Sequence, residues 1–162
     1  MNKAVFLDRD GVINKERRDY VKKLNEFEIN ENIFEVIREI KKRGFLIIII
    51  TNQSAVNRKL MKEEELLKIH NFFIQEVKKN GGMIDAIYYC PHRPDENCMC
   101  RKPKPGLILQ AVRDFDIDLG QSLMIGDSKK DIQAAKIVNC KGILLGKDES
   151  LLQKLENFWL RN

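Results

Sequence analysis

The sequence predicts an α/β protein, a three-layer α/β/α sandwich built on a mostly parallel, Rossmann-like sheet. Short apolar runs of strand length alternate along the chain with segments of helical periodicity. The run from Phe45 to Ile50 is apolar at every position, as expected for a strand that helices cover on both faces. With 162 residues, 43% of them hydrophobic, the chain is expected to fold as one domain over residues 1–162.

The expected elements alternate between strand and helix from the N-terminus onward. Each expected strand is a short apolar run, and these runs lie at 3–7, 45–51, 84–89, 122–125 and 142–145. Each expected helix repeats apolar residues with helical period, and these segments lie at 29–44, 62–80, 105–115, 129–139 and 149–160.

Particular residues mark the ends and faces of these helices. The apolar stripe of the first helix comprises Ile33, Phe34, Val36, Ile37 and Ile40. Asn30 is its expected N-cap and Gly44 its expected stop. His70 belongs to the apolar pattern of the second helix, where we expect a structural histidine that pairs with nothing. Phe158 and Trp159 are expected to pin the last helix to the core.

Two long polar segments, 11–28 and 90–104, fit no regular element. Long irregular stretches inside a compact domain are usually functional. Both follow predicted strands directly, and open α/β sheets bind ligands beyond the carboxyl ends of their strands, where the strand order reverses. We therefore expect the functional site at that edge of the sheet.

Acidic residues follow the first strand immediately. Asp8 and Asp10 end a buried strand, where two carboxylates repel each other unless a cation lies between them. So few carboxylates suit Mg²⁺, which takes one or two of them together with substrate phosphate. The alternative interpretation is an Asx-type turn in which Gly11 supplies a positive φ.

Three later segments carry groups that complement these carboxylates. Residues 51–54, Thr-Asn-Gln-Ser, close the second strand and offer a hydroxyl and backbone N–H groups to an anion. Arg101 and Lys102 supply cations for phosphoryl oxygens. Asp127 follows the fourth strand, and Asp131 lies one helical turn later.

In this order and at these strand ends, Asp-x-Asp-Gly, Thr-Asn, Arg-Lys-Pro and Gly-Asp-Ser resemble the four motifs of the haloacid dehalogenase (HAD) superfamily of phosphatases. The resemblance implies that Asp8 is the nucleophile and Asp10 the general acid/base, while Thr51 and Lys102 hold the transferring phosphoryl group. The implied Mg²⁺ ligands are Asp8, Asp10 and Asp127, with Asp131 and Ser128 in support. To protonate a leaving group near neutral pH, Asp10 is expected to have a raised pKa.

Three of the four cysteines lie within eleven residues of the chain together with one of the two histidines, as Cys90, His92, Cys98 and Cys100. Without a secretion signal, this crowding favours metal binding over disulfides. Three thiolates and one imidazole fit a closed tetrahedral zinc site, which is structural because no position is open. The alternative is a loop with incidental cysteines. Cys140 stands apart and is expected to be a small buried hydrophobe.

With this cluster the chain resembles, more narrowly, the D-glycero-D-manno-heptose 1,7-bisphosphate 7-phosphatase family and the related histidinol-phosphate phosphatases, which both carry such a zinc loop. Ser54 favours the heptose family, as does Pro105-Gly106, whereas the short spacer 93–97 favours the histidinol family. The resemblance implies substrate contacts at Asp19, Tyr20, Asn52, Gln53, Ser54 and Arg101. Ala55 and Lys59 replace glycines of the heptose family, which leaves open a different loop shape.

Composition narrows the class of protein further. No apolar run approaches the roughly 20 residues of a membrane-spanning helix, and the apolar stretch before Asp8 is too short for a signal-peptide core, so we expect a cytoplasmic protein. The net charge of +5 fits anionic partners such as phosphates. Aromatic residues make up only 7% of the chain and no basic stripe interleaves with them, so nucleic acid is not expected as a partner.

These observations predict a monomeric Mg²⁺-dependent phosphatase with a structural zinc and no large cap domain. It would act on a small phosphorylated metabolite through an aspartyl-phosphate intermediate, with the 7-phosphate of heptose 1,7-bisphosphate as the leading substrate. Histidinol phosphate is the alternative substrate. A nucleic-acid-binding zinc module and a nucleic-acid end phosphatase are further alternatives.

Overall fold

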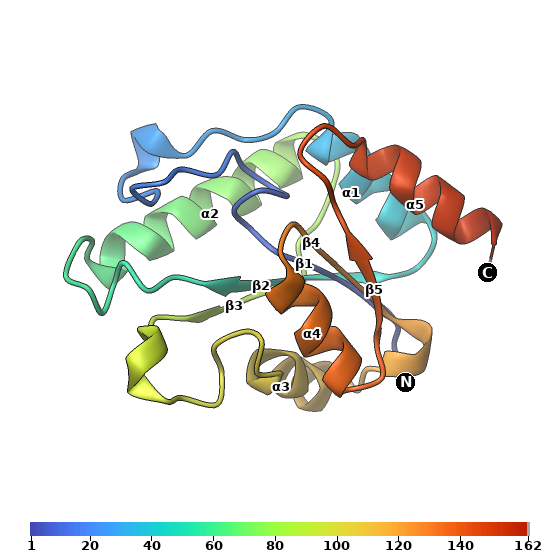
Figure 1. Cartoon of the computed structure of the whole chain (residues 1–162). Coiled ribbons are helices and arrows are strands. Elements are labelled where there is room, and N and C mark those ends of the chain that lie inside the picture. The colour runs from blue at the N-terminus through green and yellow to red at the C-terminus, as the bar shows by residue number, and fades with distance from the viewer. Residues whose placement is uncertain (162) are drawn as a thin grey trace.

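The computed structural model describes residues 1–161 and contains a five-stranded sheet between two layers of helices (Figure 1). The strands are β1 (Ala4–Leu7), β2 (Leu46–Asn52), β3 (Ala86–Cys90), β4 (Leu123–Gly126) and β5 (Lys141–Leu144). They lie in the order β3-β2-β1-β4-β5, and every neighbouring pair is parallel. The predicted three-layer α/β class is confirmed.

Helices cover both faces of the sheet, which explains the uninterrupted apolar strands. The helices are α1 (Ile33–Lys42), α2 (Glu63–Lys79), α3 (Gly106–Phe115), α4 (Lys129–Ile137) and α5 (Leu151–Leu160). In Figure 1, α1, α2 and α5 lie on one face, and α3 and α4 lie on the other. An apolar core lies on each face of the sheet, the first under α1, α2 and α5 and the second under α3 and α4. Side chains of β1 alternate between them: Val5 and Leu7 point into the first core, and Ala4 and Phe6 point into the second.

The helix boundaries lie within two residues of the predicted ones, except that α1 starts four residues later than predicted. Gly44 ends this helix with a φ of 76°, as predicted for a glycine stop. Asn30 is not the N-cap, because the helix begins at Ile33 and the side chain of Asn30 instead donates a hydrogen bond to the carbonyl of Val12 at 2.9 Å. This bond ties the long segment after β1 to the start of α1.

The two long segments after β1 and β3 contain only single 3-10 turns, Leu24–Glu26 and Pro94–Glu96, and a third 3-10 turn, Leu119–Gln121, precedes β4. No large cap domain is present among residues 1–161. Trp159 packs on the first core, and the guanidinium of Arg43 lies 4.0 Å from its ring centroid, so the last helix is pinned as predicted. In the described chain, no helix is both long and apolar enough to cross a membrane.

The sheet topology places three strand ends side by side. The chain runs from β1 outward through β2 to β3, then crosses to the other side of β1 to form β4. Strand order therefore reverses between β1 and β4, where the carboxyl ends of parallel strands open toward solvent. The residues after β1, β2 and β4 meet at this edge.

Candidate active site

Lys102 lies at the centre of this edge, between two carboxylates. Its ammonium nitrogen is 2.8 Å from Oδ1 of Asp8 and 2.6 Å from Oδ1 of Asp131. It also donates to the carbonyl of Ile50 at 2.7 Å. The side chain of Lys102 is 3% exposed, so these partners replace the water that a buried cation requires. Burial lowers the pKa of Lys102, but the two carboxylates outweigh it and hold the pKa above its usual value.

Asp8, Asp127 and Asp131 form an acidic group at the ends of β1 and β4. One oxygen from each lies within 4.8 Å of the others. A side chain at Gly11 would place its Cβ 1.9 Å from Oδ2 of Asp127, so only glycine allows this close approach. Asp131 is already engaged by Lys102 and by Ser128, whose N–H and hydroxyl donate to it at 3.1 and 3.0 Å. Asp8 accepts from Lys102 and from the backbone N–H of Arg9 through Oδ1, which leaves its Oδ2 and the carboxylate of Asp127 as oxygen ligands, a set that fits Mg²⁺.

Two members of this group, Asp8 and Asp127, resist ionisation. Burial raises the pKa of Asp8 to about 7, with the charges of Asp131 and Asp10 adding to the effect and Lys102 opposing it. Burial also raises the pKa of Asp127 to about 6, and the nearby charges of Asp131 and Glu16 add to it. A divalent cation would therefore stabilise the ionised form of the site.

Asp10 was expected to be a Mg²⁺ ligand with a raised pKa, and it differs from this expectation in both respects. Its carboxylate lies outside the acidic group, because its oxygens accept hydrogen bonds from Arg9, Asn14 and Gln53. Burial raises the pKa of Asp10, but the Arg9 charge and these hydrogen bonds outweigh it and hold the pKa below its usual value. The expected raised pKa is therefore wrong for the free protein, and the carboxylate is held as an anion.

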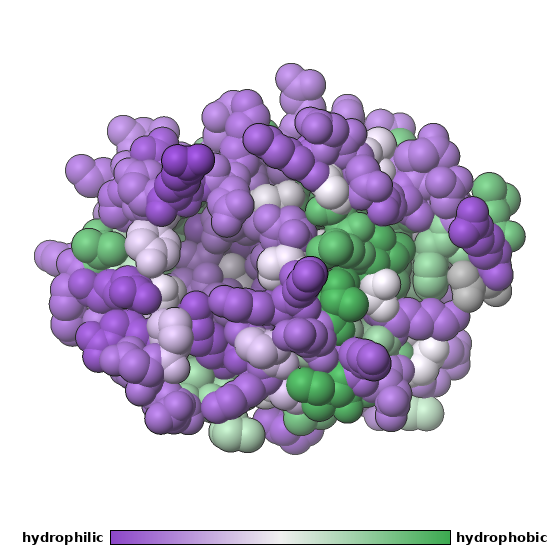
Figure 2. Space-filling view, viewed as in Figure 1, coloured by the Kyte–Doolittle hydropathy of each residue, from purple (hydrophilic) through white to green (hydrophobic). Residues whose placement is uncertain are grey.

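A cavity of about 460 Å³ opens over these carboxylates. On the face shown in Figure 2, a hollowed hydrophilic area lies over the strand ends, beside an apolar area over β5 and α4. Of the residues expected to contact substrate, Tyr20, Asn52 and Gln53 line this cavity. Thr51 is buried behind it, and its hydroxyl accepts a hydrogen bond from Gln53 at 2.9 Å.

Three other expected contacts point elsewhere. Asp19 pairs with Arg17 and Lys22 at 3.2 and 2.8 Å and is exposed. Ser54 is buried, and its hydroxyl accepts from Arg58 at 3.2 Å. The guanidinium of Arg101 donates to the carbonyl of His92 at 3.2 Å instead of reaching the cavity.

The structure adds Glu16, Arg17 and Arg18, which line the cavity and which the sequence did not single out as contacts. Lys130, which flanks the acidic group, lines the cavity as well. The sequence could have indicated these residues as contacts only through their position next to Asp19 and the acidic group. His70 was expected to pair with nothing, but its Nε2 lies 3.3 Å from Nη1 of Arg9.

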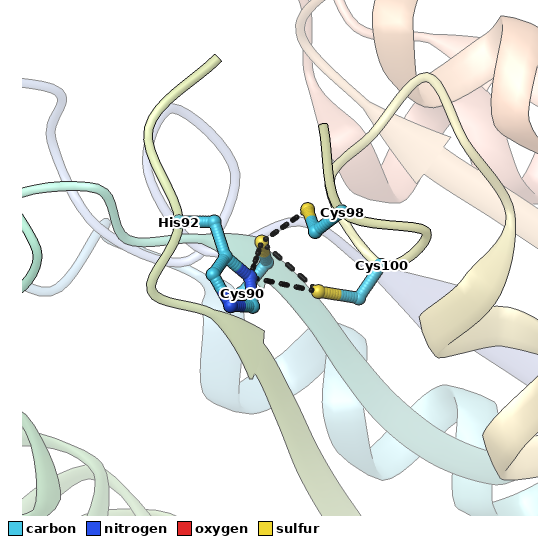
Figure 3. A group of neighbouring side chains, drawn as sticks. All are labelled: Cys90, His92, Cys98 and Cys100. Atoms are coloured by element: carbon cyan, nitrogen blue, oxygen red, sulfur yellow. Dashed lines mark hydrogen bonds between the residues drawn. The ribbon is translucent and has the colours of Figure 1, made fainter. Parts of the chain in front are cut away.

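The predicted metal cluster is assembled beside this site. Cys90, His92, Cys98 and Cys100 point toward one another, with one ligand atom from each within 4.8 Å of the others (Figure 3). Their closest sulfur–sulfur and sulfur–nitrogen distances run from 3.2 to 3.6 Å. Zinc–sulfur bonds of about 2.3 Å in a tetrahedron separate ligand atoms by about 3.7 Å, so the donor set and spacing fit zinc. All four cysteines are free thiols, and Cys140 is buried apart from the cluster.

The cluster segment also fixes Lys102. The backbone N–H of Lys102 donates to the side chain of Asn52 at 3.0 Å, and Asn52 donates back to the carbonyl of Lys102 at 3.1 Å. Two residues on, Lys104 donates to the carbonyl of Cys98 at 2.7 Å. The metal cluster and Lys102 thus belong to one short segment, which these hydrogen bonds hold in place.

Comparison with known proteins finds relatives whose names describe one kind of enzyme. The HAD-hydrolase-like family model matches residues 99–159. D-glycero-beta-D-manno-heptose-1,7-bisphosphate 7-phosphatase of Helicobacter pylori is 43% identical over 145 residues, which cover 89% of this chain and 83% of the relative. D-glycero-alpha-D-manno-heptose-1,7-bisphosphate 7-phosphatase of Campylobacter jejuni is 42% identical over 147 residues, which cover 91% of this chain and 84% of the relative. The structure of D,D-heptose 1,7-bisphosphate phosphatase from B. bronchiseptica, complexed with magnesium and phosphate, has a TM-score of 0.91 and 31% identity, and the match covers 99% of each chain.

Proposed function

The chain belongs to the heptose 1,7-bisphosphate 7-phosphatase family of HAD hydrolases, and from this premise we propose that it removes the 7-phosphate of D-glycero-D-manno-heptose 1,7-bisphosphate. One observation carries the proposal. Lys102 is buried between Asp8 and Asp131, so a carboxylate nucleophile and a cation for phosphoryl oxygens share one site with Asp127.

The proposed reaction has two displacements at phosphorus. An oxygen of Asp8 attacks, the bond from phosphorus to the sugar oxygen breaks, and Asp10 gives that oxygen a proton. Water then attacks the aspartyl-phosphate, Asp10 takes a proton from it, and inorganic phosphate leaves Asp8. Asp10 is an anion in the free protein; it takes a proton from solvent when the dianionic ester enters, because a nearby negative charge raises the pKa of a carboxyl group, and it returns a proton to solvent after inorganic phosphate has left.

We propose Mg²⁺ as the catalytic ion and Zn²⁺ as the structural ion. Asp8 and Asp127 would hold Mg²⁺, which supplies positive charge to the transferring phosphoryl group. The relative from B. bronchiseptica, complexed with magnesium and phosphate, supports this choice. Cys90, His92, Cys98 and Cys100 would hold zinc with no open position, and Lys102 would keep the phosphoryl oxygens beside Asp8.

The cations that line the cavity favour a second phosphate on the substrate. Arg17, Arg18 and Lys130 line the cavity with Glu16 as an added acidic residue. Such a lining suits the distal phosphate of a sugar bisphosphate. Histidinol phosphate carries a cationic amine and an imidazole in place of a second phosphate, so these cations would attract it less and would repel its amine.

Phosphate release tests the proposal. We expect release from heptose 1,7-bisphosphate with Mg²⁺ present, and much slower release from histidinol phosphate, with the Asp8→Asn variant as the blank. Both anomers are assayed, because the H. pylori and C. jejuni relatives carry different anomers in their names. Equal activity of wild type and Asp8→Asn would overturn the nucleophile, and a preference for histidinol phosphate would overturn the substrate.

A further inference from the structure

A buried guanidinium lies directly behind the active site. Arg9, between the two aspartates, is 1% exposed and has the largest volume among the fully buried side chains of residues 1–161. Its Nη2 and Nε lie 3.0 and 3.3 Å from Oδ1 of Asp10. The Phe27 ring covers its face at 5.6 Å. A buried charge is tolerated only when its donors are paired, so each partner of Arg9 matters.

The remaining partner of Arg9 comes from a distant helix. His70, in the middle of α2, is 6% exposed, and its Nε2 lies 3.3 Å from Nη1 of Arg9. A guanidinium has donors and no acceptor, so Nε2 must accept and the imidazole proton lies on Nδ1. The ring is held against Tyr89 at a centroid distance of 5.9 Å, and the Tyr89 hydroxyl is hydrogen-bonded to Glu63 of the same helix.

This array makes the two oxygens of Asp10 unequal. Oδ1 accepts both bonds from Arg9 and a third from Asn14 at 2.9 Å. Oδ2 accepts from Gln53 at 2.8 Å, and Gln53 lines the cavity. The acceptor capacity of Oδ1 is therefore used within the protein, whereas Oδ2 lies on the cavity side of the carboxylate.

Resting on the proposed function, we infer that His70 and Arg9 are positioning residues for Asp10. His70 fixes the guanidinium, the guanidinium anchors Oδ1, and Oδ2 is thereby presented as the oxygen that exchanges a proton with the leaving group and with water. The packing of α2 on the sheet therefore affects, through His70 and Arg9, how the carboxylate of Asp10 is oriented. Arg9 and His70 are not among the residues that line the cavity, and neither belongs to a candidate metal cluster.

Variants of His70 test the inference without touching the cavity. His70→Leu keeps an apolar side chain of similar bulk but leaves Nη1 of Arg9 without an acceptor. His70→Gln retains an acceptor oxygen near the place of Nε2, and His70→Asn carries its amide one methylene too short to reach. Leu66→Ala, one turn earlier on the buried side of α2, is the matched control that loosens the helix without changing the array.

We expect His70→Leu and His70→Asn to lower kcat at least tenfold with KM changed less than threefold, because the ground-state contacts to phosphate remain. His70→Gln should stay within threefold of the wild-type kcat, and Leu66→Ala within twofold at a comparable or larger fall in Tm. A structural role alone would instead make kcat follow Tm through all four variants.

The inference is overturned if His70→Leu or His70→Asn keeps kcat within twofold of the Leu66→Ala control, or if KM alone changes. If His70→Leu does not fold, the comparison of His70→Gln with His70→Asn carries the same test. Failure of the proposed function would be seen separately, as a wild type no more active on heptose 1,7-bisphosphate than Asp8→Asn. In that case the four variants are compared on p-nitrophenyl phosphate.

Discussion

One ammonium group serves several buried acceptors at this site. Lys102 satisfies Asp8, Asp131 and a carbonyl of β2; Asp131 and the β2 residue Ile50 are buried, whereas Asp8 faces the cavity. The sequence could place Asp8 directly after an apolar run of strand length, and Lys102 and Asp131 in segments that follow such runs. It could not show that Arg101, the neighbouring cation, turns back to the carbonyl of His92, since that direction depends on the fold of the loop.

Removing Lys102 should therefore destabilise the protein as well as inactivate it. Lys102→Met leaves Asp8 and Asp131 buried without their cation, and breaking a buried pair in this way costs about 3–5 kcal/mol. The free energy of unfolding is measured by urea denaturation at pH 8 and at pH 5, and the loss should be smaller at pH 5, where protonation removes the repulsion. Lys130→Met, an exposed cation at the same cavity, is the control and should change stability by less than about 0.5 kcal/mol. Similar losses for both variants would contradict the argument.

Two short segments shape the site at the scale of elements. Residues 90–104 hold the metal cluster and Lys102 together, and residues 53–60 carry the departures from the family glycines. The side chain of Asn57 donates to Glu96 at 3.0 Å, so the two segments are joined. The cysteine spacing made the cluster predictable, whereas the loop shape depends on backbone angles. Ala55 is buried without a positive φ, but Lys59 has a φ of 62°.

The two glycine replacements should have opposite effects. Lys59 is exposed and its backbone has the left-handed conformation that glycine adopts most easily, so Lys59→Gly should raise the free energy of unfolding by about 0.5–1 kcal/mol. Ala55→Gly removes a buried methyl group and frees the unfolded chain, so it should lower stability by about 1 kcal/mol. Both changes in the free energy of unfolding are to be measured by chemical denaturation. A gain in stability from Ala55→Gly would mean that the alanine strains the loop.

The metal cluster should act as a structural unit. Cys98→Ser removes one ligand; we expect wild type to contain one zinc ion per chain and Cys98→Ser to contain much less, with a lower Tm and with lower activity through displacement of Lys102. Metal content is measured by mass spectrometry after gel filtration. Cys140→Ser, a buried cysteine outside the cluster, should keep its zinc. Full zinc content in Cys98→Ser would exclude a four-ligand site.

Over the whole molecule, the parallel sheet brings together residues that are far apart along the chain. Consecutive apolar strands made the parallel order predictable, and with it the meeting of Asp8, Thr51 and Asp127 at one edge. The pairing of Arg9 with His70 spans 61 residues and depends on how α2 packs, so no local pattern marks it. Burial raises the pKa of Asp10, but the charge of Arg9 and the hydrogen bonds from Arg9, Asn14 and Gln53 lower it by more, and the sequence does not show where those side chains point, which is why the expectation of a raised value was wrong.

The charge balance of the site should make the stability of the entire fold depend on pH and on Mg²⁺. Asp8 and Asp127 have raised pKa values of about 7 and 6 in the folded protein, against 3.8 as the ordinary value. Between about pH 4 and 7 the folded state therefore binds more protons than the unfolded state, and stability falls as pH rises, by up to ~1.4 kcal/mol per pH unit for each group. Asp10 acts in the opposite direction, but its contribution is lost only as pH falls below about 4.

Mg²⁺ should reverse this loss, because it binds the ionised carboxylates of the folded state. At a concentration one hundred times its Kd it adds about 2.7 kcal/mol. Urea denaturation in magnesium-free buffer at pH 5, 6, 7 and 8, repeated with Mg²⁺, measures both effects. Asp127→Asn should show a shallower pH slope and a weaker response to Mg²⁺, since one of the two titrating ligands is gone. A wild-type stability that is flat from pH 5 to 7 without Mg²⁺ would mean that Lys102 alone neutralises the acidic group, and the ion would then contribute to catalysis without stabilising the fold.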